Sequence, residues 1–193
     1  MLRQVICGAL MMGLLAAGAV SLTAPSETIQ VIMKTSKGDL TIELYPDKAP
    51  ATVANFLKHV DDKFYDGTIF HRVIPDFMIQ GGAYTANFQK KEPPFPFVKN
   101  ESLNGLKNEK YTLAAARMGE PHTHQNQFFI NNTDNSGLDF PSTDDGGFGY
   151  CVFGKVIEGT AVIDAISALR TMMRRGMQDV PRETVTILSV RRK

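Results

Sequence analysis

The stretch FHRVIPDFMIQGG, residues 70–82, decides the fold, because it sets arginine, histidine and glutamine among large apolar residues. A guanidinium is not buried without partners, so Arg72 is either paired structurally or faces a cleft where its donors meet a ligand. The residues alone favour the structural ion pair. The neighbouring Gln80 and the exposed-looking apolar residues Phe77 and Met78 keep the cleft interpretation open.

The sequence on both sides of this stretch has the period of β-strands. Residues 29–34 and 40–44 alternate apolar and polar side chains, and Ser36-Lys37-Gly38-Asp39 between them has the chemistry of a turn, so they predict a β-hairpin. Further short β-type runs cover residues 68–74, 77–81, 111–117, 127–131, 150–156 and 184–191. Many short strands punctuated by Gly and Pro predict a sandwich or a closed barrel, and periodicity does not choose between them.

Two segments have helical spacing. Val53, Phe56, Leu57 and Val60 lie on one face of a predicted helix, with Pro50 suited to its first turn. Residues 160–169 predict a second amphipathic helix.

Residues 83–110 and 132–149 are predicted to be irregular. Loops of that length in a compact domain are typical of functional or binding segments.

Composition indicates one ordinary globular domain. The chain has 193 residues, of which 43% are hydrophobic and 21% are charged. Its 21 basic and 20 acidic residues leave a formal charge of +1, without a run of Lys and Arg interleaved with aromatics. We therefore expect no nucleic-acid partner.

The N-terminus has the order of a secretory signal peptide. A positive start is followed by an apolar stretch over residues 5–20 and by small residues before the polar chain. We predict a signal peptide at residues 1–24, a mature domain at residues 25–193, and export, in a bacterium to the periplasm. The alternative is an uncleaved anchor, because the apolar run approaches the roughly 18 residues that begin to span a bilayer.

For three other features of the sequence we predict a packing or surface position rather than a catalytic or metal-binding role. Cys151 lies in an apolar run and is expected to be a small buried hydrophobe rather than a nucleophile. His122 and His124 form an HxH pair in a polar stretch; we interpret them as surface residues and expect no metal. Met172 and Met173, with Met177, suggest a soft apolar patch used for packing.

Residues 70–82 resemble the signature of the cyclophilin family almost residue for residue. The resemblance extends through ATVANFLKHVDDKFYDGTIF at 51–70, QFFIN at 127–131 and GYCVFGKV at 149–156, and it covers essentially the whole chain beyond the signal. Tyr150, together with the segments at 115–117 and 178–181, resembles the exported bacterial branch of that family.

The resemblance implies a mainly β fold, a closed eight-stranded antiparallel β-barrel capped by two α-helices, with peptidyl-prolyl cis/trans isomerase activity. Matched residue by residue, Arg72 would be the catalytic arginine and Gln80 its positioning partner. The matched substrate-binding positions are Phe77, Met78, Ala116, Arg117, Gln127, Phe129, Leu138 and Tyr150. Gly137 stands where many members carry Trp, a residue associated with strong cyclosporin binding, and where bacterial members often carry Phe, so the resemblance leaves cyclosporin sensitivity open.

The expected function is isomerisation of Xaa-Pro bonds in exported polypeptides by a monomer that needs no cofactor and meets the membrane through an uncleaved N-terminus or not at all. Two rival functions stay open. One is a peptide-binding module with the same groove and incidental turnover. The other is an anchored interaction protein in which the long loops matter most.

Overall fold

The computed structural model describes residues 28–141 and 147–193. The predicted signal peptide lies outside the described residues, as does part of the long segment 132–149. Within the described chain, no helix is long and apolar enough to cross a bilayer.

The described chain forms ten strands, two α-helices and two short 3-10 turns. The strands are β1 Ile29–Thr35, β2 Gly38–Leu44, β3 Thr68–Ile74, β4 Met78–Thr85, β5 Thr112–Ala115, β6 Phe128–Asn131, β7 Val152–Glu158, β8 Thr171–Arg174, β9 Met177–Pro181 and β10 Thr186–Arg192. The helices are α1 Pro50–Asp61 and α2 Thr160–Ser167, and the 3-10 turns are η1 Ser102–Asn104 and η2 Ser136–Leu138.

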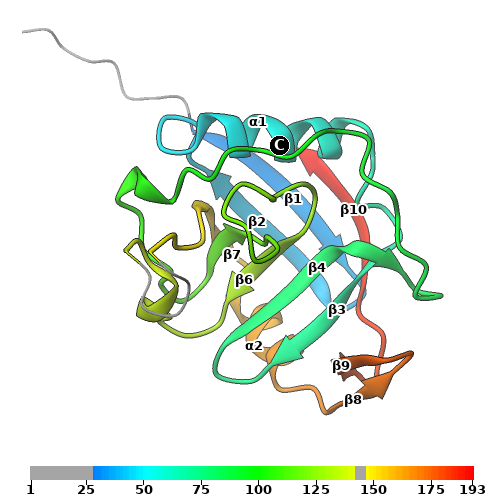
Figure 1. Ribbon diagram of the computed structural model, residues 1–193. Coiled ribbons are helices and arrows are strands. Elements are labelled where there is room, and N and C mark those ends of the chain that lie inside the picture. The colour runs from blue at the N-terminus through cyan, green and yellow to red at the C-terminus, as the bar shows by residue number, and fades with distance from the viewer. Residues whose placement is uncertain (1–27, 142–146) are drawn as a thin grey trace, which may run out of the picture.

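Eight of the strands close into an antiparallel barrel in the order β1-β10-β3-β4-β6-β5-β7-β2 (Figure 1). The barrel, not the sandwich, is therefore the correct alternative. The β1–β2 hairpin is confirmed, with pairs running from Ile29 opposite Leu44 to Thr35 opposite Gly38. Gly38 has φ 135°, a conformation that side chains disfavour, which explains a glycine where this hairpin turns.

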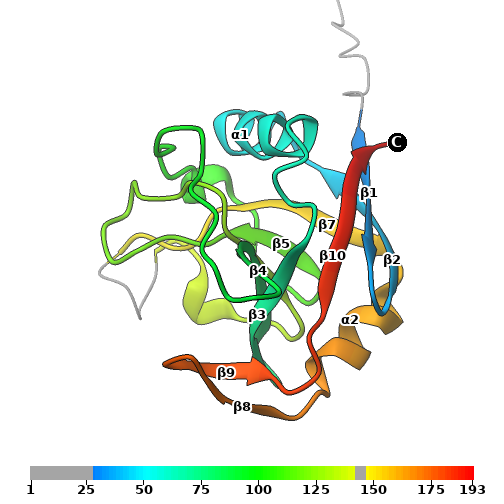
Figure 2. The same cartoon turned by 90° about the vertical axis from the view of Figure 1, so that its right-hand side faces the viewer.

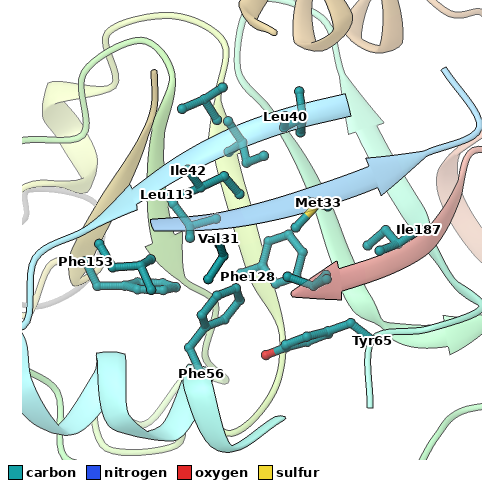
Figure 3. Packing of buried hydrophobic residues seen from close by; sticks show 14 of the residues in the cluster. Val31, Met33, Leu40, Ile42, Phe56, Tyr65, Leu113, Phe128, Phe153 and Ile187 are labelled. Atoms are coloured by element: carbon teal, nitrogen blue, oxygen red, sulfur yellow. The ribbon is translucent and has the colours of Figure 1, made fainter. Parts of the chain in front are cut away.

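The barrel interior is filled by the inward-facing half of each strand. Val31 and Met33 of β1 are fully buried beside Leu40 and Ile42 of β2. Aromatic rings from α1 and the opposite strands complete this core (Figure 3). Each fully buried apolar side chain of this size contributes about 1.5–3 kcal/mol of transfer free energy.

Phe56 of α1 joins the helix to the barrel. Its ring centroid lies 5.3 Å from that of Phe153 and 5.9 Å, edge to face, from that of Phe128 (Figure 3). Helix α1 and helix α2 lie at opposite ends of the barrel in both views (Figures 1 and 2). The two predicted helices are therefore confirmed, although α2 ends two residues earlier than expected.

The N-terminus of α1 is capped from a distant part of the chain. Pro50 occupies the first turn, and Ala49 before it has no side-chain acceptor. The Glu101 carboxylate instead accepts hydrogen bonds from the amides of Ala51 (3.1 Å) and Thr52 (2.8 Å) and from the Thr52 hydroxyl (2.7 Å). An anion at a helix N-terminus also interacts favourably with the helix dipole.

One prediction for the irregular segments is wrong, and one hairpin outside them was not predicted at all. Residues 83–85 belong to β4, because tertiary pairing extends the strand beyond its apolar run. Residues 171–181 form the β8–β9 hairpin, whose alternation is too polar to read from sequence. On this hairpin Met172 and Met173 are 43% and 66% exposed, so they do not pack as predicted.

We expect Glu101→Ala to lower the free energy of unfolding by about 1–2 kcal/mol, because two helix amides and a buried hydroxyl lose their acceptor. Urea unfolding of the purified protein measures this. Glu92→Ala is the matched control, since Glu92 is 82% exposed and pairs with Lys90 at 4.0 Å. Equal stability of the two variants would contradict the distant cap.

Candidate active site

The candidate site lies on the outer face of the barrel, where a cross-strand row runs over five strands. Arg72 of β3 lies opposite Gln80 of β4, which lies opposite Phe129 of β6. Ala114 of β5 continues the row between Phe129 and Val152 of β7. Because side chains alternate along each strand, these residues all point away from the core.

The alternation sets the two faces apart sharply at β3 and β4. Val73 and Ile79, which pair with each other, are buried in the main core. Arg72, one residue earlier, points outward and its side chain is 42% exposed. Arg72 is therefore not buried in the core, and it faces a depression of the surface.

A second apolar cluster forms the floor of that depression. Met78, Phe129 and Val152 are buried in it, and Phe77, Leu138 and Tyr150 pack against it from the loops and strand ends. The depression has a volume of about 120 Å³ and gathers nine of the ten sequence-predicted site residues. These are Arg72, Phe77, Met78, Gln80, Ala116, Arg117, Phe129, Leu138 and Tyr150.

Gln127, the tenth predicted residue, lies outside this depression but is tied to it. Its Oε1 accepts a hydrogen bond of 2.9 Å from Nε2 of Gln80. Gln127 also lines two neighbouring depressions, of about 220 Å³ and about 300 Å³. The site is thus a row of three adjoining hollows rather than one pocket.

The backbone expected to meet a peptide is already partly engaged. The Ala116 amide donates to the Gln127 carbonyl at 3.1 Å. The Ala116 carbonyl lies 3.0 Å from Nδ1 of His124, and a carbonyl oxygen still has a second lone pair. A main-chain ligand at Ala116 would therefore meet an acceptor rather than a donor.

Arg117 braces one wall of the depression. Its guanidinium carbon lies 4.7 Å from the centre of the Tyr150 ring. It also donates to the carbonyl oxygens of Met118 at 3.0 Å and Phe148 at 2.8 Å. The Tyr150 ring in turn packs edge to face on Phe129 at 5.5 Å, so this wall is held by a chain of ring contacts.

Two buried histidines lie next to the site. Burial lowers the pKa of His71 to about 4, with the adjacent Arg72 charge acting in the same direction. Burial lowers the pKa of His124 to about 4 as well. Both rings are therefore neutral at pH 7, and Arg72 is the cation at this end of the row.

The structure contradicts the surface position predicted for His124 and confirms the burial predicted for Cys151. His124 is buried rather than on the surface, because its ring closes the space beneath the Ala116 carbonyl. Cys151 is buried as predicted, and burial raises the pKa of its thiol to about 12. Within residues 28–141 and 147–193, no group of three or more His, Cys, Asp and Glu side chains is arranged to hold a metal ion.

Sequence reasoning missed the far wall of the site. Met177, Gln178 and Asp179 of β9 line the depression of about 300 Å³ together with Arg72 and Gln80. Nothing in the local pattern of these residues predicts a strand, and their place beside Arg72 depends on tertiary packing.

The comparisons with known proteins agree on one family. The family model described as "Cyclophilin type peptidyl-prolyl cis-trans isomerase/CLD" matches residues 30–192. Peptidyl-prolyl cis-trans isomerase cyp18 of Streptomyces antibioticus is 50% identical over 161 residues, which cover 83% of this chain and 96% of that protein. Peptidyl-prolyl cis-trans isomerase B of Escherichia coli (strain K12) is 49% identical over 161 residues, covering 83% of this chain and 97% of that protein.

A solved structure gives the same fold at lower identity. The crystal structure of a cyclophilin type peptidyl-prolyl cis-trans isomerase of Cryptosporidium parvum matches with a TM-score of 0.71 and 24% identity. The match covers 86% of this chain and 98% of that chain. This likeness supports the eight-stranded barrel independently of the sequence matches.

We expect the free energy of unfolding to fall as the pH drops from about 6.5 toward 4, because the unfolded chain protonates histidines that the fold keeps neutral. His71 and His124 have folded pKa values of about 4. Their contribution is therefore fully present above about pH 6.5 and is lost on acidification, by about 2 kcal/mol per histidine at pH 5. Urea unfolding at pH 7.5, 6 and 5 measures it.

His71→Gln removes one of the three histidines whose pKa is lowered by burial, His59, His71 and His124, and serves as the internal control. Its stability should fall by about 2 kcal/mol less than that of the parent protein between about pH 7.5 and 5. The carboxyls of Asp61 and Asp66, whose pKa values are lowered by Arg192 and Arg191, contribute below this window. A variant with the full pH dependence of the parent protein would contradict the assignment to His71.

Proposed function

Since this chain belongs to the cyclophilin-type peptidyl-prolyl cis-trans isomerase family and is such an isomerase, we propose that Arg72 and the apolar depression beside it form its catalytic centre. Its substrates are polypeptides that contain proline. One observation carries the proposal. A half-exposed guanidinium, paired in register with Gln80, borders a depression of about 120 Å³ with an apolar floor.

The reaction requires neither a nucleophile nor a cofactor on this proposal. Rotation about an Xaa-Pro bond meets a barrier of about 18–20 kcal/mol because it breaks the amide resonance. As the bond twists, the prolyl nitrogen recovers its lone pair. A donor aimed at that nitrogen binds the twisted amide more tightly than the planar one, and this difference lowers the barrier.

Arg72 has the chemistry for that donor. Its guanidinium is planar, permanently charged and carries a fixed fork of N–H groups, whereas a lysine would supply the charge without the fork. Gln80, its cross-strand partner, is itself fixed by the hydrogen bond to Gln127. Gln80 is therefore held in place beside Arg72 before a substrate arrives.

The apolar floor has two roles in this mechanism. Met78 and Phe129 lie buried beneath the depression, with Phe77, Leu138 and Tyr150 around it. A proline ring seated there keeps water away from the reacting amide. A guanidinium acts more strongly across a medium of low dielectric constant than across bulk water.

We further propose that the clients are exported polypeptides and that the enzyme assists their folding. The observation behind this is the order of residues 1–24: a positive start, an apolar middle and small residues near Ala24. On this proposal residues 25–193 form the mature, monomeric enzyme, and the protein works in the bacterial periplasm.

We expect Arg72→Ala to lower kcat/KM for a short Xaa-Pro peptide by about a hundred- to a thousand-fold, the usual effect of removing a donor that acts in the transition state. Arg72→Lys is expected to recover a small part of the loss, because lysine restores the positive charge but not the planar fork of N–H donors. Cis-to-trans relaxation of the peptide, followed over a range of peptide concentrations, gives kcat and KM.

Both variants should fold like the parent protein, since the Arg72 side chain is 42% exposed and outside the core. Circular dichroism and the urea midpoint check this. Full activity of a folded Arg72→Ala protein would refute the proposed mechanism. Tight peptide binding by the parent protein without accelerated isomerisation would favour the peptide-binding module instead.

We expect the protein recovered from the periplasm of a bacterium expressing the full chain to have lost residues 1–24. Intact-mass spectrometry of the purified protein measures the cleavage point, and size-exclusion chromatography measures the oligomeric state. A mass that retains the first 24 residues, with the protein in the membrane fraction, would support the anchored alternative. An early-eluting dimer would contradict the monomer.

A further inference from the structure

The β8–β9 hairpin stands beside β3, the strand that carries Arg72 (Figures 1 and 2). Its base is closed by the hydrogen bond of 2.9 Å from the Arg182 amide to the Arg170 carbonyl. Val180 of β9 is 1% exposed and anchors the hairpin against the barrel. The residue before it, Asp179, is therefore held at a defined place at the edge of the site.

A β-bulge turns the Asp179 side chain out of the regular strand pattern. Met172 pairs with Val180 and Arg174 with Met177, so Gln178 and Asp179 together lie opposite the single residue between them on β8. Asp179 has φ 58°, a left-handed conformation that is uncommon for a residue other than glycine. Bulges of this kind re-aim side chains, and they are frequent next to active sites.

The bulge places the Asp179 carboxylate on the Nε side of the Arg72 guanidinium. Oδ2 of Asp179 lies 3.9 Å from Nε of Arg72, and both side chains line the depression of about 300 Å³. Arg72 also lines the apolar depression of about 120 Å³, in which Asp179 takes no part. Arg72 thus stands between the carboxylate and the proposed proline site.

We propose that Asp179 is a positioning residue for Arg72, an inference that rests on the proposed catalytic role of that arginine. An arginine side chain carries about 2 kcal/mol of rotamer entropy, so a free Arg72 would sample many directions. A carboxylate at Nε restricts that sampling and leaves the terminal N–H groups directed toward the apolar depression. On this proposal Asp179 acts through Arg72 and takes no part in the apolar depression where the proline would bind.

The partial exposure of the pair indicates a role in orientation rather than in stability. The side chains of Arg72 and Asp179 are 42% and 39% exposed, and ion pairs in water contribute about 0–1 kcal/mol to folding. The same interaction affects catalysis directly if the guanidinium must already point at the twisted amide. Its removal is therefore expected to change the rate while the stability stays the same.

The kinetic test compares Asp179→Ala with Asp179→Asn in the full purified protein. We expect Asp179→Ala to lower kcat by about two- to five-fold with KM unchanged, the size of effect that an exposed pair can supply. Oδ2 lies 3.9 Å from Nε, beyond hydrogen-bond distance, so the interaction is one of charge. Asp179→Asn, which keeps the size of the side chain and loses its charge, is therefore expected to lower kcat about as much as Asp179→Ala. Unchanged kcat in Asp179→Ala, or an increase, would overturn the proposal.

Glu183→Ala provides the matched control. Glu183 lies shortly after β9, is 62% exposed and pairs with Lys37 at 2.6 Å, away from the row of site residues. We expect this variant to keep the parent kcat and KM. A loss equal to that of Asp179→Ala would mean that both changes act through surface charge or hairpin structure, and it would overturn the positioning role.

Two further measurements separate this proposal from the proposed function. NMR of the Arg72 Nε–H group in isotope-labelled protein detects the pairing without a substrate; we expect a shifted and more mobile signal in Asp179→Ala. In an Arg72→Ala background, Asp179→Ala is expected to have no further effect on kcat. An active Arg72→Ala protein refutes the catalytic role, and the NMR signal still decides whether Asp179 orders Arg72; an unchanged signal refutes the positioning role alone.

Discussion

Closure of the barrel is the constraint on which the rest of the structure depends. Pairing of β1 with β10 and of β2 with β7 leaves each of the eight strands with two neighbours. A closed sheet has an inside and an outside, and its core is complete without help from the outer face. The outer face is therefore free to carry a second apolar cluster, the one proposed to hold the substrate proline.

Strand register determines which side chains face the barrel core and which face the candidate site. Pairing of Val73 with Ile79 in the interior determines that Arg72 and Gln80 face outward together. A slip of one residue would exchange the faces, burying a guanidinium and exposing two branched apolar side chains. The large cost of that error means that the barrel core holds the site residues in place, although none of them lies inside the barrel.

Secondary structure, which depends on short-range pattern, could be predicted from the sequence. Contacts between residues far apart in the chain could not. Strand and helix periods predicted the eight barrel strands and both helices, but barrel and sandwich share those periods, so the closed topology came from resemblance alone. His124 looks like a surface residue in its polar stretch, and its burial depends on β5 and the loop beside it. Glu101 and Asp179 act on residues far away in the chain, Thr52 and Arg72, and no local signal marks such pairs.

The partial exposure of Arg72 meets two opposite requirements that the proposed mechanism places on the burial of its guanidinium. A fully buried guanidinium requires partners that neutralise it, and such partners would compete with the substrate. A fully exposed one would act through water, where its interaction with a developing lone pair is weak. A side chain 42% exposed, with a carboxylate no nearer than 3.9 Å and an apolar floor on its other side, keeps most of its charge available. On the proposed mechanism, a proline ring that covers this floor removes the water itself, so the dielectric constant falls at the moment the donor is needed.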